Sequence, residues 1–140
     1  MQHRIRFFAV VTTALAAASV APLHGLGAQP QPTLAEQMAA ALPQLRATLP
    51  KQVDDITTWT GIDAQGTEFV YEMLVSVTVP AERLVEVGRT IQEANQTRLC
   101  ADPSSGGLIR RGASMRHHYR DAAGNRFETR VASCPPVSTN

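Results

Sequence analysis

The sequence predicts an α+β domain, in which an antiparallel sheet of about four strands is made of two β-hairpins and carries helices on one face. Three observations support this fold class. Two turn motifs with the pattern Asp-Ala-X-Gly each separate two segments of β-forming character. A segment with helical spacing of apolar residues precedes each hairpin. One cysteine lies at the end of the second helical segment, and the other lies at the end of the last predicted strand.

Residues 1–28 have the features of a secretory signal peptide. Arg4 and Arg6 form a positive start, and residues 7–21 are apolar and rich in small side chains. An uncleaved anchor is the alternative, but this run is short for a membrane span of about 20 residues. We therefore expect a periplasmic or secreted protein without a transmembrane segment in the mature chain.

The mature chain is predicted to form one domain over 29–134, with a flexible tail over 135–140. It keeps all twelve acidic residues and eleven of the thirteen basic ones, so its net charge is −1. This balance argues against nucleic-acid binding, which requires a basic protein. Acidic residues dominate 29–93 and basic residues dominate 94–140. The two parts attract each other within the fold, or the basic part attracts a partner.

The first helical segment begins at a capping box formed by Thr33 and Glu36 and ends before Pro50. Pro43 is expected to kink or divide this helix, because proline removes a backbone donor. A second helix is predicted over 80–99. A loop over 102–107 and a single helical turn are expected to follow it.

The first hairpin is predicted to pair strands over 53–62 and 67–77. A one-residue bulge after the turn, at Gly66, sets the register. Trp59 then faces Tyr71 on the core side. The outer side is predicted to carry Ile56, Thr58, Thr60, Ile62, Glu68, Val70, Glu72 and Leu74.

The second hairpin extends over 113–134 around the turn at 121–124. The same bulged register places Tyr119 opposite Phe127 on the core face. Met115 and Val131 are predicted to lie on this face as well. Strand order stays open, because the inner strands of the two hairpins can pair in parallel across the intervening helix.

Cys100 and Cys134 are expected to form a disulfide, because two cysteines in an exported chain most often pair. A redox-active thiol is the alternative, but the sequence contains no Cys-X-X-Cys motif. Closing a loop of this length stabilises a fold by about 4 kcal/mol in the chain-entropy model.

The outer face of the second hairpin is rich in arginine and is the candidate binding surface. Its site residues are Arg116, His118, Arg120, Arg126, Glu128 and Arg130. The register sets Arg120 opposite Arg126. It also sets Arg116 opposite Arg130. Like charges that face each other directly on a sheet repel, which is unfavourable. A neighbouring strand, an anionic ligand or solvent must relieve them. Arginine binds carboxylates and phosphates in bidentate fashion, and His118 beside Glu128 would make binding respond to pH. A solvated scaffold face is the alternative.

No catalytic or metal-binding constellation is specific in this sequence, and no cofactor is expected. His117 and His118 are adjacent on a strand and point to opposite faces, so they cannot bind one metal together. Glu68 and Glu72 share a strand face. They either form a carboxylate pair or, as we favour, meet the arginines of the second hairpin. A small hydrolase using both glutamates with His118 would require a pocket on which all three converge.

The order of these features resembles a loosely defined set of small exported bacterial proteins without assigned function. In them a segment like residues 49–58, LPKQVDDITT, opens a first hairpin, and a helix that ends near a cysteine follows. A second hairpin with a Tyr-X-Asp-X-X-Gly pattern and a last cysteine complete the resemblance. The corresponding residues here are Cys100, Tyr119, Asp121, Gly124 and Cys134. The resemblance implies the fold and the exported location, and it implies no catalytic residue.

These inferences predict an exported binding module that uses its arginine-rich face to bind an unknown envelope protein or an anionic ligand. An inhibitor or immunity-type partner of an envelope hydrolase is the first alternative. Such a protein would dock through a loop or through an outer patch of Ile56, Val70 and Leu74. The hydrolase described above is the second alternative.

Overall fold

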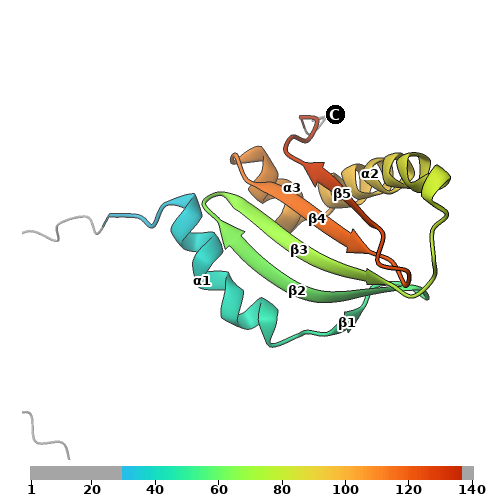
Figure 1. Ribbon diagram of the computed structural model, residues 1–140. Helices are drawn as coiled ribbons and strands as arrows, with labels where there is room; N and C mark the ends of the chain where they lie inside the picture. The colour runs from blue at the N-terminus through green and yellow to red at the C-terminus, as the bar shows by residue number, and fades with distance from the viewer. Residues whose placement is uncertain (1–29, 137–140) are drawn as a thin grey trace, which may run out of the picture. The chain divides into compact units, whose positions relative to one another are not determined.

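A five-stranded sheet with helices on one of its faces forms the fold of this protein (Figure 1). The computed structural model describes residues 30–136, so the predicted signal peptide and residues 137–140 of the predicted tail lie outside the described part. The elements in chain order are α1 (Leu34–Arg46), β1 (Lys51–Gln52), β2 (Thr57–Gln65), β3 (Glu68–Val75), the 3-10 turn η1 (Ala81–Arg83), α2 (Leu84–Ala101), α3 (Pro103–Arg110), β4 (Ser114–Arg120) and β5 (Arg126–Val131). The predicted α+β class is confirmed. The fifth strand is the short β1.

The strands lie in the order β1-β2-β3-β4-β5. The inner pair β3 and β4 is parallel, and the other three pairs are antiparallel. A parallel pair needs a long crossover connection, and η1, α2 and α3 provide it here. Of the strand orders that the sequence left open, the structure therefore adopts parallel pairing of the inner strands.

Local capping chemistry explains where the helices begin. The predicted capping box is present, because Glu36 N donates to Thr33 Oγ1 and Thr33 N donates to the Glu36 carboxylate. Pro43 lies inside α1 without dividing it, and the helix ends at Arg46, earlier than predicted. Helix α2 extends the predicted second helix to Ala101.

The loop predicted over 102–107 is wrong, because α3 occupies most of it. Asp102 caps this helix by accepting a hydrogen bond from Ser105 N at 2.7 Å, and Pro103 is the first helical residue. An aspartate followed by proline is a helix start signal. Proline, serine and glycine favour a loop here, but the cap formed by Asp102 outweighs that preference.

The register predicted for the second hairpin is confirmed. Tyr119 pairs with Phe127 and Met115 with Val131. The rings of Tyr119 and Phe127 stack with their centroids 4.8 Å apart. Met115, Tyr119 and Val131 are buried, and Phe127 is half-buried.

The register predicted for the first hairpin is wrong. The strands continue to Gln65 and Glu68, so the turn has two residues, and the bulge lies at Thr60 instead. Trp59 therefore faces Met73, and Ile62 faces Tyr71 and is buried rather than on the outer side. The predicted strand also starts too early, because residues 53–56 form a turn in which Asp54 accepts hydrogen bonds from Ile56 N and Thr57 N.

The core lies between the sheet and all three helices. Met38 of α1, Leu99 of α2 and Ile109 of α3 share one buried cluster with Phe69 and Met115 of the sheet. The predicted disulfide between Cys100 and Cys134 is present and links the end of α2 to the segment after β5. No helix in the described part is long and apolar enough to cross a membrane.

The turn aspartate of the second hairpin also holds a distant segment of the chain. Asp121 is 2% exposed, and its carboxylate accepts hydrogen bonds from Val79 N at 2.7 Å and from Asn125 N at 2.7 Å. Burial alone would raise the pKa of Asp121, but the hydrogen bonds from Val79 and Asn125 lower it. Asp121 thus fixes the connection between β3 and α2 to the hairpin turn.

We expect Asp121→Ala to lower the melting temperature several times more than Asp63→Ala does. Asp63 is the equivalent residue of the first turn motif, but it is exposed and its ion pair is with Arg46 at 3.0 Å. Losing an exposed ion pair changes stability little, whereas losing Asp121 leaves a buried backbone donor without a partner. Thermal unfolding of both variants measures the difference. Equal shifts would show that Asp121 is only a turn residue.

Candidate functional site

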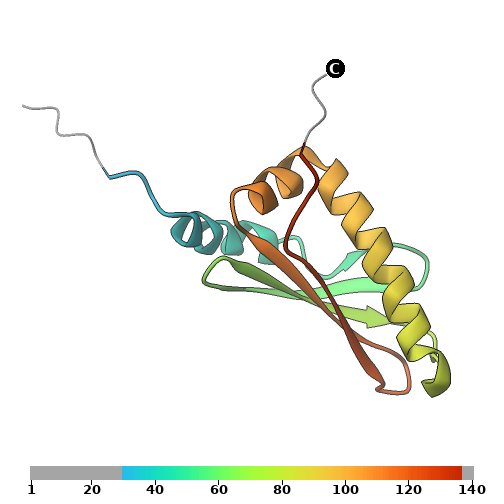
Figure 2. The ribbon, with the colours of Figure 1, turned by 90° about the horizontal axis from the view of Figure 1, so that it is seen from above.

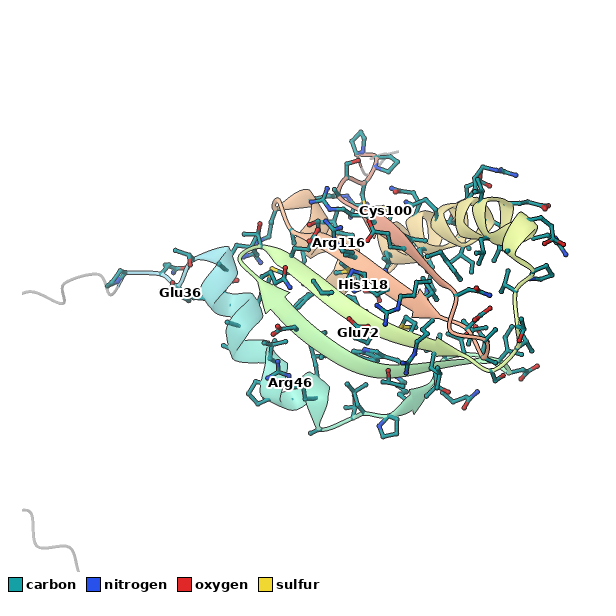
Figure 3. All side chains as sticks on the ribbon, viewed as in Figure 1. Glu36, Arg46, Glu72, Cys100, Arg116 and His118 are labelled. Atoms are coloured by element: carbon teal, nitrogen blue, oxygen red, sulfur yellow. A yellow bond between two sulfur atoms is a disulfide. The ribbon has the colours of Figure 1, made fainter. Side chains whose placement is uncertain are left out.

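The outer face of the sheet, opposite the helices, is built of rows of side chains that run across β3, β4 and β5. The pairing of the strands defines three rows, namely Leu74–Arg120–Arg126, Glu72–His118–Glu128 and Val70–Arg116–Arg130. Figure 3 shows Glu72, His118 and Arg116 together on this face. All six predicted site residues therefore lie on one surface, and the rows decide which of them have partners.

The row with Arg116 and Arg130 is neutralised by Glu68 from the neighbouring strand. Arg116 Nε contacts one carboxylate oxygen of Glu68 at 3.0 Å, and Arg130 Nε contacts the other. Ser114 Oγ donates a third hydrogen bond at 2.8 Å. Burial alone would raise the pKa of Glu68, but the hydrogen bonds from Arg130, Ser114 and Arg116 lower it to about 2. These two arginines are therefore internal partners of Glu68 rather than open binding groups.

The middle row carries negative charge around one histidine. His118 Nδ1 lies 3.0 Å from Glu72 Oε1, and its Nε2 lies 3.7 Å from Glu128 Oε2. Arg116 reaches the other Glu128 oxygen at 3.2 Å. Glu72 thus pairs with a histidine, and only Glu68 meets arginines as the sequence interpretation favoured. Among the described residues no group of histidine, cysteine, aspartate and glutamate has metal-binding geometry.

The row with Arg120 and Arg126 is not neutralised. Among the described residues, no carboxylate lies within 4.0 Å of either guanidinium group. Both side chains are exposed, and the two residues face each other across β4 and β5. Leu74 lies next to Arg120 on β3 and is 38% exposed. Unpaired positive charge and exposed apolar surface therefore meet at this end of the outer face.

A groove of about 730 Å³ runs over this end of the face. Its outer-face lining includes Glu72, Leu74, His118, Arg120, Arg126 and Glu128. Four of the predicted site residues thus line one groove, whereas Arg116 and Arg130 do not. Glu68 does not line it either, so Glu68, Glu72 and His118 do not converge on one pocket as the hydrolase alternative requires. Val70 is only 5% exposed, which removes it from the docking patch proposed for an inhibitor.

A second cavity, of about 500 Å³, lies on the opposite, helix-covered side of the sheet. Trp59, Tyr71, Met73 and His117 form its floor, and Arg98 of α2 lies at its edge. The sequence interpretation assigned these aromatic residues to the core and missed the cavity. The sequence feature that could have indicated the cavity is the pair of large aromatic residues on neighbouring strands, Trp59 and Tyr71. Their partial exposure, however, depends on where the helices lie.

Comparison with known proteins supports the fold. No family model matches the sequence, and no curated protein matches it. Three solved structures are similar. A protein from Pseudomonas aeruginosa that is inferred to be secreted has 14% identity and a TM-score of 0.59, over 70% of this chain and 88% of that chain. The pilotin EpsS of the Vibrio vulnificus type II secretion system has 18% identity and a TM-score of 0.58, over 74% and 93%. The type II secretion pilotin AspS of Vibrio cholerae has 18% identity and a TM-score of 0.55, over 70% and 87%. At these identities the similarity shows a shared fold.

Proposed function

We propose that this protein is an exported binding module of the bacterial envelope, which holds an acidic surface of a partner protein in the groove of its outer face. The facing pair Arg120 and Arg126 carries the proposal. Like charges directly opposite on a sheet are unfavourable unless an anion relieves them. Glu68 relieves the other arginine pair, but the described part of the chain has no ion pair for this one. A carboxylate of a partner would provide the missing charge and the bidentate geometry that arginine favours.

The surroundings of the arginine pair favour a protein as the partner. Leu74 lines the groove and is 38% exposed, so the groove combines apolar contact area with charge. Glu72 and Glu128 line the same groove and add negative charge on either side of His118. Such mixed complementarity selects one orientation of a partner surface and is typical of protein interfaces.

The envelope location rests on two further observations. The N-terminal residues have the composition of a signal peptide. Three proteins of similar fold include one inferred to be secreted and two pilotins of type II secretion systems. These observations support an exported interaction protein and leave the identity of the partner to experiment.

The test is a charge reversal of the groove, with Arg120→Glu and Arg126→Glu combined. Partners are first recovered from the envelope fraction with the tagged wild-type protein, and the affinity of the recovered partner is then measured by calorimetry. We expect the double variant to bind at least about tenfold more weakly, and wild-type binding to weaken as salt increases.

The matched control is Arg83→Glu combined with Arg89→Glu. It changes the net charge equally, but at two exposed residues that precede or belong to α2, on the other side of the sheet. We expect this control to bind like the wild type. If the groove variant retains full affinity, or if the control loses as much, the groove is not the binding surface.

A further inference from the structure

We propose that the cavity on the helix-covered side is a second binding site, which takes a short segment of a partner polypeptide with apolar side chains next to a carboxylate. This site, here called the aromatic cleft, is lined by Trp59, Tyr71, Met73, His117 and Arg98 together with β1. It lies on the opposite side of the sheet from the groove. The proposal therefore stands independently of the function proposed above.

The arrangement of the helices leaves this cleft open. Helix α1 packs on β2 and helix α2 packs on β5, and neither packs extensively on the central strand β3. Figure 2 shows the two helices lying apart over the sheet. The cleft of about 500 Å³ lies between the C-terminal part of α2 and the edge strand β1. This volume falls in the range of ligand sites in proteins.

The floor of the cleft is a stack of aromatic rings. The ring centroids of Trp59 and Tyr71 lie 5.4 Å apart, and the Tyr71 ring stacks on His117 at 4.7 Å. Trp59 and Tyr71 are only half-buried, so their ring surfaces are available to a ligand. Aromatic rings held by their neighbours provide large apolar contact area at low entropic cost. The floor is thus preformed for apolar side chains.

One polar group beneath the cleft has no hydrogen-bond partner among residues 30–136. His117 is 3% exposed, and its Nδ1 atom makes no hydrogen bond. Such buried unsatisfied groups are rare in folded proteins and destabilise them. Burial, followed by the nearby charge of Arg98, lowers the pKa of His117 to about 4, so the ring is neutral near neutral pH. A polar group without a partner therefore favours a ligand site over a floor that serves only as core.

The charge at the edge of the cleft favours a ligand that carries a carboxylate. Arg98 and Lys51 line it, and neither has a carboxylate of the described chain within 4.0 Å. Asp102 is the acidic lining residue, but its carboxylate caps α3 by accepting from Ser105 N at 2.7 Å. The open charge at the edge is therefore positive, which complements a carboxylate on the ligand.

The lining favours a polypeptide over a fatty acyl chain. Gln52 and Ser105 add amide and hydroxyl groups to the walls. One N–H of the Gln52 amide donates to Asp54 O at 2.6 Å. Its second N–H and the Ser105 hydroxyl can bind the polar backbone of a peptide, whereas an acyl chain would bury them without a hydrogen bond. The neighbouring β1 has only two residues, so this edge of the sheet also leaves the cleft accessible.

The experiment uses Trp59, the one tryptophan in the sequence, as an intrinsic reporter. The mature protein is titrated with a pentapeptide amide that alternates leucine and phenylalanine around one central glutamate. The same peptide with glutamine, and laurate, are the comparison ligands. We expect saturable changes of Trp59 emission with the glutamate peptide, and binding of the glutamine peptide weaker by about tenfold.

Variants then test the role assigned to Arg98. Arg98→Gln should weaken the glutamate peptide by about tenfold and make the two peptides equivalent, while Arg98→Lys retains the preference. Arg89→Gln on the same helix should bind like the wild type. An unchanged Trp59 emission, tighter binding of laurate than of the glutamate peptide, or an Arg98→Gln variant that still prefers glutamate would each overturn the proposal.

Discussion

Replacing Cys100 and Cys134 together by serine is expected to lower the free energy of unfolding by about 4 kcal/mol. The disulfide joins residues 34 apart in sequence and restricts the unfolded chain accordingly. It fastens α2, the main helix of the crossover, to the segment after β5. For a domain of this size such a loss is a large part of a total stability of about 5–15 kcal/mol.

Urea unfolding of the wild type and the double variant measures this effect. A reducing agent provides the control, because it should bring the wild type to the stability of the variant and leave the variant unchanged. A difference below about 1 kcal/mol would show that packing of Leu99 and the hydrogen bonds of Asn95 hold α2 without the bond.

Lowering the pH from 6.5 to about 4 is expected to reduce the free energy of unfolding by about 3 kcal/mol through His117 alone. Burial lowers the pKa of this histidine to about 4, and the charges of Arg98 and His118 act in the same direction. The unfolded chain then binds the proton before the folded protein does. The contribution is fully present above pH 6.5 and is lost as the pH falls towards 4.

His117→Phe is the variant that tests this assignment, because it retains a ring against Tyr71 and removes the titrating group. Urea unfolding at several pH values should show a fall for the wild type and a flat profile for the variant between pH 6.5 and about 4.5. The stability that Asp121 and Glu68 provide is lost mainly below about pH 4.5, because their pKa values are lowered in the folded protein and the unfolded carboxyl groups bind protons first.

His118→Gln is the matched control, since it changes the adjacent residue on the opposite face of β4 and keeps the buried ring. It should retain most of the fall. A wild-type profile that is flat down to pH 4.5 would contradict the buried, neutral state of His117. A fall of equal size in His117→Phe would assign the effect to another group.

The two hairpins show why one register was predictable and the other was not. In the second hairpin, Asp121 binds the backbone of its own turn, so local chemistry sets the pairing of Tyr119 with Phe127. In the first hairpin the bulge lies in mid-strand, before Gly61, where a side chain would come within 3.2 Å of Glu72. Such a bulge depends on the facing strand, and no local turn signal reports it.

The candidate site also has one part that the sequence predicts and one part that depends on the tertiary structure. The sequence predicted two facing pairs of arginines on one face, because alternation and one local turn are sufficient for that. Which pair is neutralised depends on the parallel pairing of β3 with β4, which brings Glu68 next to Arg116 and Arg130. Charge neutralisation across strands that are distant in sequence cannot be inferred from either hairpin alone.

The sequence by itself determined the α+β class, the disulfide, the capping box of α1 and the whole register of the second hairpin. Each of these follows from residues that act over a few positions or from the pairing of two cysteines. Only the tertiary structure decided the strand order, the arginine pair that stays without a carboxylate, and the cleft over Trp59 and Tyr71. These depend on where the crossover helices come to lie, which is set by long-range packing.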